Sequence, residues 1–218
     1  MATIDDPRQR LLNAAGEVFV EKGFKGATVR EICRRANVNG SSINYYFRNK
    51  EHLYIDTVKQ AACGLPVQAQ DRPWPPETPP ADKLRGFIRV MLAHLMNPNR
   101  PAWHTRLMMR ELAQPTSACA ELVREYIAPS AAVLMEILNE LLPPDLPRWK
   151  RFMTAFSIVS QCLYYLQNRP IARLLVGEED FKWFDEARLA EHIAQFSLAA
   201  LGVPGRFDDP SRARSAAE

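Results

Sequence analysis

The stretch TVREICRRANVNGSSINYYFRNKEHL, residues 28–53, decides the fold of this chain. Thr28 and Glu31 stand at the two ends of a capping box, a pattern that begins a helix. The helix should end at Asn37, because asparagine tolerates the left-handed backbone conformation that closes helices. A second short helix begins near Ser41, where serine suits a helix start. Two short helices joined by about four residues have the dimensions of a helix-turn-helix.

Helices are expected on both sides of this pair. One is predicted over residues 7–22, because aspartate and proline precede it and Gly23 follows it as a C-terminal cap. Another begins near Lys50, with apolar residues at helical spacing. We therefore predict one small helical domain over residues 1–64, with the helix-turn-helix at about residues 28–47.

The rest of the chain also has helical patterns. Six of the seventeen prolines fall in residues 65–80, which are expected to form an extended connector. Residues 81–204 show apolar positions at helical spacing and no strand candidate. Within them, Pro129 predicts a kink or break near Glu125. The polar segment 205–218 is expected to be a disordered tail. The predicted fold is all-α, with a three-helix N-terminal domain followed by a helical bundle.

Positive charge is concentrated near the N-terminus. Residues 22–50 hold seven basic residues and one acidic residue, Glu31, whereas the whole chain of 218 residues has a net charge of only +3. Such a patch attracts polyanions such as nucleic acid, chiefly by displacing their counterions. A solvated helix face is the alternative, and composition alone leaves both open.

Other classes of site find no support in the sequence. The histidines and cysteines follow no metal-ligand spacing, and there is no catalytic motif, so we expect no metal, no cofactor and no enzyme activity. The cysteines are expected to be buried small hydrophobic residues, with a redox sensor as the alternative. No apolar run reaches the roughly 18 residues of a membrane span, and no signal peptide is evident. We expect a cytoplasmic protein.

Two segments resemble the DNA-binding domain of TetR/AcrR-type transcriptional regulators: TVREICRRANV at 28–38 and YYFRNKEHL at 45–53. The lead-in at residues 19–28, with its Phe-x3-Gly-Phe-x3-Thr pattern, fits the same family. Residues 110–116 and 156–162 resemble the ligand-sensing domain of the CecR-like branch. The resemblance implies a helix-turn-helix DNA-binding domain and a C-terminal bundle for ligand sensing and dimerisation.

The second helix of a helix-turn-helix lies in the major groove, where its N-terminal residues reach base edges. Asn44 is the predicted base-reading residue because its amide pairs bidentately with adenine, although it stands where the family often carries an aromatic. Capping or a phosphate contact is the alternative for Asn44. The resemblance implies phosphate contacts for Thr28, Tyr46 and Lys50, with a core position as the alternative for Tyr46. The expected DNA-binding residues are Thr28, Arg30, Asn39, Gly40, Ser41, Ser42, Asn44, Tyr45, Tyr46 and Lys50.

Residues 147–168 are apolar on nearly all faces, so one face should pack on the core of the bundle and the other on a partner. A homodimer is expected, since two copies of the DNA-binding domain match a palindromic operator in double-stranded DNA. The expected interface comprises Phe156, Val159, Leu163, Leu189, Ile193 and Phe196.

An effector pocket is expected among aromatic, sulfur-containing and polar side chains of the bundle, although plain core packing is the alternative for each of them. The candidates are His94, Trp103, His104, Met108, Met109, Gln161, Tyr164 and Tyr165. A small, mostly apolar or aromatic effector would release the DNA by favouring one of two conformations. The predicted function is thus a sequence-specific repressor. An effector-independent, architectural DNA-binding protein is the alternative.

Overall fold

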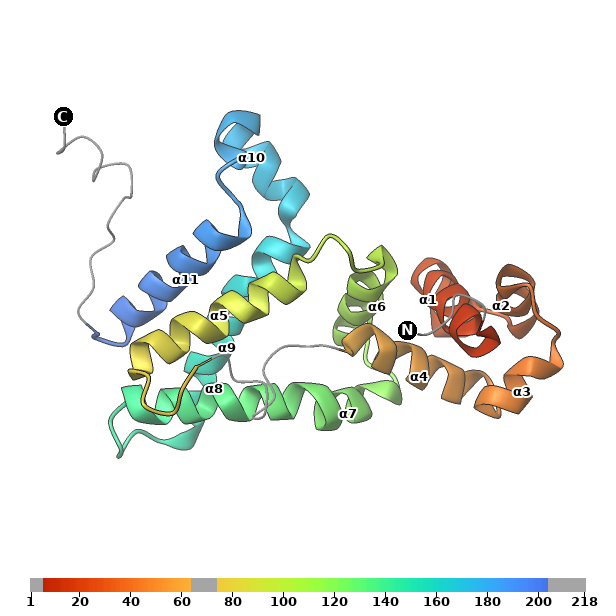
Figure 1. Cartoon of the computed structure of the whole chain (residues 1–218), viewed down its shortest axis with the longest axis horizontal. Coiled ribbons are helices and arrows are strands. Elements are labelled where there is room, and N and C mark those ends of the chain that lie inside the picture. Colours follow the sequence, from red (N-terminus) through yellow and green to blue (C-terminus); the bar gives the residue numbers. More distant parts are fainter. Residues whose placement is uncertain (1–5, 64–73, 204–218) are drawn as a thin grey trace. The chain divides into compact units, whose positions relative to one another are not determined.

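The computed structural model describes residues 6–63 and 74–203 (Figure 1). Every regular element in these two ranges is a helix, which confirms the all-α prediction. The chain packs as two units. The first comprises residues 1–65 and 97–128, and the second comprises residues 66–96 and 129–218.

The first unit begins with the helix-turn-helix and the helices that flank it. Local signals start the first two helices as predicted: the Asp6 carboxylate accepts from the backbone N–H of Arg8 at 2.9 Å, and the Thr28 hydroxyl accepts from that of Glu31 at 3.2 Å. Gly23, expected to end the first helix, has a non-helical φ of 71°, but the helix continues to Gly26. Asn37 closes the second helix in the left-handed conformation, with φ of 51°. The four helices are α1 (Pro7–Gly26), α2 (Val29–Ala36), α3 (Ser41–Phe47) and α4 (Lys50–Ala62).

Three further elements belong to the first unit: α6 (Ala102–Ala113), α7 (Ala118–Leu122) and the π-helix η2 (Val123–Ile127). The indole of Trp103 on α6 lies flat against Gly16 on α1, where a Cβ would stand only 2.2 Å from a ring atom. Trp103 and Leu107 therefore share one core with Phe19 and Tyr54. Packing thus joins residues 97–128 to the first unit, and the domain bounds expected at residues 1–64 and 81–204 stay predictions.

The π-helix η2 ends two residues before Pro129. Proline has no backbone N–H, so it cannot donate to the carbonyl of Glu125 one turn earlier, and the helix widens there. A kink or break was predicted near Glu125; the structure has a π-helical stretch there, and the chain stays helical from Ala118 to Leu141. A regular helix resumes at Ala128 and continues to Leu141, just before the Pro143-Pro144 pair.

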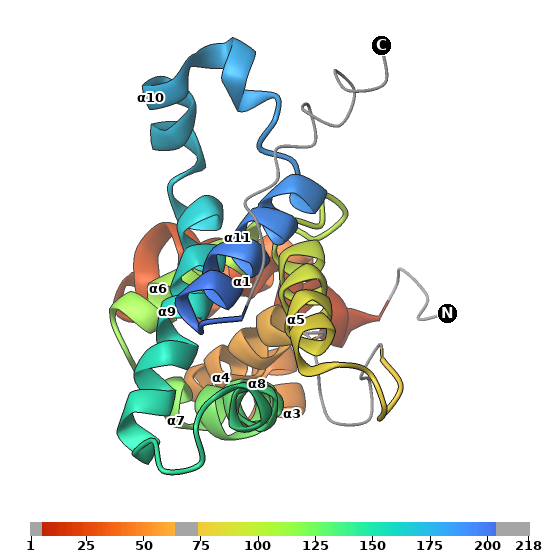
Figure 2. The same ribbon diagram turned by 90° about the vertical axis from the view of Figure 1, so that its left-hand side faces the viewer.

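The described part of the second unit has five helices, and four of them contribute to a core that includes Phe87, Ile137, Ile158 and Ile193. Helix α10 was not expected from the sequence, and in both views it projects away from the rest of its unit (Figures 1 and 2). The helices are α5 (Pro80–Leu95), α8 (Ala128–Leu141), α9 (Arg148–Gln167), α10 (Arg169–Phe181) and α11 (Glu186–Ala200).

Two predicted segments lie largely outside the described residues. Most of the connector expected at residues 65–80 falls in the undescribed stretch 64–73, and the tail expected at 205–218 falls beyond residue 203. No helix in the described part of the chain is long and apolar enough to cross a membrane.

Replacing Gly16 with alanine should destabilise the first unit by about 1–3 kcal/mol, because the new methyl group would overlap the Trp103 ring. Thermal unfolding followed by circular dichroism measures the change. Gly40→Ala is the matched control, since nothing lies within 4 Å of its Cβ position. Equal melting temperatures for the two variants would contradict the packing.

Candidate nucleic-acid interface

Helix α3 has a buried apolar face and an exposed, mostly polar face. Ile43 and Phe47 are almost fully buried, whereas Ser41, Asn44 and Tyr45 are exposed, Tyr45 to 82%. Residues three and four positions apart share one face of a helix, so these exposed side chains form a continuous strip. The Asn44 amide makes no hydrogen bond within the described part of the chain, and its donors and acceptor are available to a ligand.

The side chain of Asn39 stabilises the turn before α3. The Asn39 side-chain oxygen accepts from the backbone N–H of Ser41 at 3.1 Å and lies 3.3 Å from the Ser41 hydroxyl. Gly40 has open space where a Cβ would stand. Ser42, also expected to contact DNA, is half-buried at the start of the helix. The turn is therefore exposed and ordered, as a major-groove contact requires.

Lys50 links the start of α4 to the segment before α2. Its ammonium donates to the backbone carbonyls of Phe24 at 2.9 Å and Ala27 at 3.0 Å, and lies 4.6 Å from the centre of the Phe24 ring. An ammonium has three N–H donors, so one remains for a phosphate. The sequence did not indicate this contact, because backbone carbonyls carry no sequence signal.

Thr28 and Tyr46, the other expected phosphate contacts, have different environments. Thr28 is exposed, and its hydroxyl keeps a hydrogen to donate while it caps α2. Tyr46 is half-buried against the core of the first unit, with its ring edge-on to Tyr45 at 4.8 Å between centroids. Tyr46 thus contributes to packing and has a partly accessible side chain.

Two of the basic residues form ion pairs within the first unit and so stabilise its fold. Arg35 bonds to Glu21 at 2.6 Å and to Glu31 at 2.9 Å, and Lys22 bonds to Glu31 at 2.5 Å. The hydrogen bond from Arg35 lowers the pKa of Glu21, and that from Lys22, followed by that from Arg35, lowers the pKa of Glu31. The remaining positive potential comes from exposed basic residues that form no ion pair with described residues: Lys25, Arg30, Arg34 and Arg48.

The eight candidate effector-pocket residues fall in both units. Trp103 and Met108 are buried in the core of the first unit. Burial, followed by the charge of Arg100, lowers the pKa of His104 to about 4, so this histidine is neutral at pH 7. Residues on α6 in the first unit are Trp103, His104, Met108 and Met109; those in the second unit are His94 on α5 and Gln161, Tyr164 and Tyr165 on α9.

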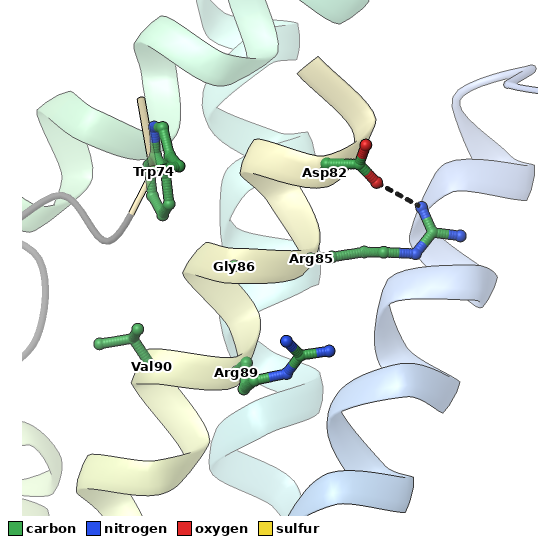
Figure 3. Close-up of a pocket in the computed structure, with 6 residues that line it drawn as sticks. All are labelled: Trp74, Asp82, Arg85, Gly86, Arg89 and Val90. Carbon is green, nitrogen blue, oxygen red and sulfur yellow. Dashed lines mark ion pairs between the residues drawn. The ribbon is translucent and has the colours of Figure 1, made fainter. Parts of the chain in front are cut away.

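A surface hollow of about 320 Å³ lies on α5 in the second unit, and none of its lining residues was predicted (Figure 3). The Trp74 ring approaches Gly86, which has no side chain to displace it. Arg85 lies 3.9 Å from Asp82 and 3.5 Å from Glu191 of α11. The lining residues are Trp74, Asp82, Arg85, Gly86, Arg89 and Val90.

The residues expected at the dimer interface divide into two groups. Phe156 is 62% exposed and Phe196 is 51% exposed, and Val159 and Leu163 are half-buried. Leu189 and Ile193, by contrast, lie in the core of the second unit. They were expected at the interface because helical spacing shows that a residue faces an apolar neighbour, but does not show whether that neighbour is in the same chain.

The four cysteines differ in accessibility. Cys33 and Cys162 are buried, and burial raises the pKa of both thiols, that of Cys162 to about 12. These two match the expectation of buried, unreactive side chains. Cys119 is half-buried, and Cys63 is exposed at the end of α4.

Two family models match the chain. Residues 11–57 match the bacterial regulatory proteins of the tetR family, and residues 80–201 match the C-terminal domain of the HTH-type transcriptional dual regulator CecR. The second match alone spans more than half of the chain. This protein belongs to the TetR family of transcriptional regulators.

Several TetR-family regulators are similar to the chain over much of its length. The HTH-type transcriptional repressor NicS of Pseudomonas putida is 38% identical over 175 residues, which cover 76% of this chain and 78% of NicS. The probable regulator YttP of Bacillus subtilis is 26% identical over 144 residues, 61% of this chain and 63% of YttP. The repressor AcnR of Corynebacterium efficiens is 27% identical over 106 residues, 47% of this chain and 50% of AcnR. The chain therefore spans less than two thirds of YttP and AcnR.

Solved structures share the TetR-like fold. FadR from Bacillus subtilis, in complex with stearoyl-CoA, has a TM-score of 0.62 at 17% identity and covers 88% of this chain and 97% of its own. A HlyIIR mutant with residues 169–186 replaced by a linker has a TM-score of 0.62 at 23% identity, covering 87% and 95% of the two chains. At sequence identities this low, the similarity shows a shared fold and no more.

Replacing Lys50 with methionine should lower the stability of the first unit by about 1–3 kcal/mol, because two backbone carbonyls lose a charged donor. Chemical denaturation of the full chain measures this loss. Lys25→Met, at an exposed position without an ion pair to described residues, is the control and should change stability by less than about 0.5 kcal/mol. A loss no greater than that of the control would show that the two carbonyl contacts contribute little.

Proposed function

We propose that this protein is a homodimeric transcriptional repressor that binds a palindromic operator through α3 and is released by a small, mostly apolar or aromatic effector. The observation that carries the proposal is the exposed strip of Ser41, Asn44 and Tyr45, held on the buried anchor of Ile43 and Phe47. The similarity to NicS, a transcriptional repressor, supports repression as the direction of control.

In this proposal α3 enters the major groove. The unoccupied amide of Asn44 pairs with an adenine, and the Ser41 hydroxyl bonds to a neighbouring base. Thr28, Tyr46 and the remaining N–H of Lys50 bind phosphates, which fix the position of α3 without reading sequence. Arg30 and the other exposed basic residues add a general attraction for DNA.

Dimerisation supplies the second half of the binding surface. A single seven-residue helix makes few contacts, so a useful affinity requires two copies on one duplex. The exposed Phe156 and Phe196 of the second unit, together with Leu174 at 84% and Leu175 at 75% exposure on α10, support an apolar contact with another copy. Large apolar side chains left exposed in numbers are often covered by a partner when they form a contiguous patch.

Effector control is proposed for the helical bundle of the second unit. FadR, which shares the fold, was crystallised in complex with stearoyl-CoA, a ligand with a long apolar acyl chain, and this supports an effector with an apolar part. An effector releases DNA only if it binds the non-binding conformation more tightly than the DNA-binding one. Four of the candidate pocket residues lie in this unit and remain predictions for such a site: His94, Gln161, Tyr164 and Tyr165.

Selection of duplexes from a random library with the full-length protein tests the proposal. The expected product is an inverted repeat whose half-sites lie about one helical turn, or a multiple of it, apart. Continuous coating of DNA without a preferred sequence would favour an architectural protein. Failure to bind any duplex at moderate ionic strength would reject a DNA-binding role.

Asn44→Ala should relax selectivity at one base pair of each half-site by roughly 1–3 kcal/mol, because a bidentate contact to a base is lost. Competition binding with all four base pairs at each half-site position measures this effect. Arg34→Ala, which removes only general charge, should weaken binding to every sequence alike. The same uniform weakening with Asn44→Ala would exclude Asn44 as a base-reading residue.

Phe156→Glu should convert the dimer to monomers, because it places a charge within the exposed apolar surface of α9. Sedimentation velocity over a range of protein concentrations measures the oligomeric state. Tyr45→Glu places the same charge on an exposed aromatic residue of α3 and should leave the dimer intact. If Phe156→Glu remained a dimer, the interface would have to lie on another surface.

A further inference from the structure

Helix α6 carries a buried carboxylate that the proposed DNA contacts do not use. Glu111 is 0% exposed, and the segment around it, residues 110–116, is one of the two that resemble the CecR-like branch. Removing a carboxylate from water costs several kcal/mol unless hydrogen bonds compensate for the lost hydration. The partners of Glu111 therefore indicate what this residue stabilises.

Glu111 accepts hydrogen bonds from three donors in two other parts of the first unit. The hydroxyl of Tyr54 on α4 donates to Oε2 at 2.5 Å. The backbone N–H and the hydroxyl of Thr116 donate to Oε1 at 2.8 and 2.9 Å. The Thr116 hydroxyl in turn accepts from the backbone N–H of Ala118, at the start of α7. One side chain thus connects α4, α6 and the entry to α7.

From Tyr54 the contacts continue to the DNA-binding face. Burial, followed by the hydrogen bond to Glu111, raises the pKa of Tyr54, so its hydroxyl stays protonated and continues to donate. Its ring lies 4.8 Å from that of Phe19 and 5.1 Å from that of Phe24, between centroids. Phe24 in turn lies under the ammonium of Lys50, one helical turn before Tyr54 on α4.

Neighbouring side chains hold the same helices. Arg110, adjacent to Glu111, donates to the carbonyl of Val20 on α1 at 3.4 Å and lies over Gly23, where α1 is interrupted with φ of 71°. At the two ends of α4, Glu51 accepts from Ser117 at 2.8 Å, and Lys59 pairs with Glu121 at 2.6 Å. Helices α1 and α4, which flank the helix-turn-helix, are therefore both attached to the α6–α7 segment.

We propose that Glu111 is a positioning residue for DNA binding. Its carboxylate fixes α4 against the α6–α7 segment and, through Tyr54 and Phe24, fixes Lys50 and the approach to α3. This inference rests on the proposed binding of DNA through α3. It assigns to residues 110–116 the task of holding the DNA-reading helices in one orientation.

The role requires a carboxylate, and not only a side chain of that shape. Oε1 of Glu111 accepts from both donors of Thr116, whereas Oε2 accepts from the hydroxyl of Tyr54 and lies 3.1 Å from the Thr116 hydroxyl. A glutamine at this position would direct its NH₂ group at one of these donors. Glu111→Gln therefore removes one of the two acceptor oxygens of the network, and it also removes a negative charge. Electrostatics alone predicts tighter DNA binding for this variant, whereas loss of positioning predicts weaker binding.

The test uses the full-length protein and a duplex selected by it from a random library, with a scrambled duplex for comparison. Glu111→Gln should weaken binding to the selected duplex by about 10-fold and to the scrambled duplex by much less, because the network acts on the orientation of α3. Glu17→Gln, an exposed position on α1 of the same unit, makes the same charge change and should bind as tightly as the wild type or more tightly. Unchanged or tighter binding by Glu111→Gln would overturn the proposal, as would equal weakening on both duplexes.

A double-mutant cycle with Tyr54→Phe tests the connection to α4. If the two residues act together, the double variant should bind within about 3-fold of the weaker single variant. Fully additive losses would mean that Glu111 does not act through Tyr54. Tyr54→Phe also keeps the proposal testable if Glu111→Gln fails to fold, because it should reproduce the loss of selectivity.

Hydrogen exchange of the DNA-free proteins provides a readout that does not depend on DNA. Glu111→Gln should speed exchange in α4 and at residues 114–118, and should leave α11 of the second unit unchanged. Faster exchange throughout the chain, or none in α4, would overturn the positioning role. If the wild type bound no duplex, the proposed function would fail, while the exchange experiment would still decide whether Glu111 holds α4.

Discussion

A helix of seven residues does not persist in water by itself, and the DNA-reading surface of this protein is such a helix. Helix α3 therefore depends on the burial of Ile43 and Phe47 in the core of the first unit. That core is in turn completed by α6, whose Trp103 lies against Gly16. The exposed strip of α3 thus owes its position to packing contacts that extend well beyond the helix-turn-helix.

Local chemistry made much of the fold predictable. Asp6, Thr28 and Asn37 act on backbone groups within a few residues of themselves, so their effects can be inferred from short stretches of sequence. The same holds for Pro129, whose missing donor acts one turn away. The exposed polar strip of α3 was predictable for the same reason, since helical spacing alone places Ser41, Asn44 and Tyr45 together.

The remaining features depend on contacts between distant residues, and the sequence carries no signal for them. Lys50 binds two backbone carbonyls more than twenty positions away, and Glu111 binds a tyrosine 57 positions away. Helix α10 was missed because its large aliphatic residues are exposed and do not follow the pattern of a helix packed in its own unit. Arg35 was counted toward the cationic patch, but its bonds to Glu21 and Glu31 join α2 to α1.

The uneven burial of the cysteines has a practical consequence. Cys63 presents its thiol to solvent at the end of α4, whereas Cys33 and Cys162 are withdrawn from water and from reagents. A spin label or fluorophore attached under mild conditions should therefore modify the native chain chiefly at Cys63, without engineered mutations. In a two-copy assembly, the distance between two such probes would report how far apart the paired DNA-reading domains stand.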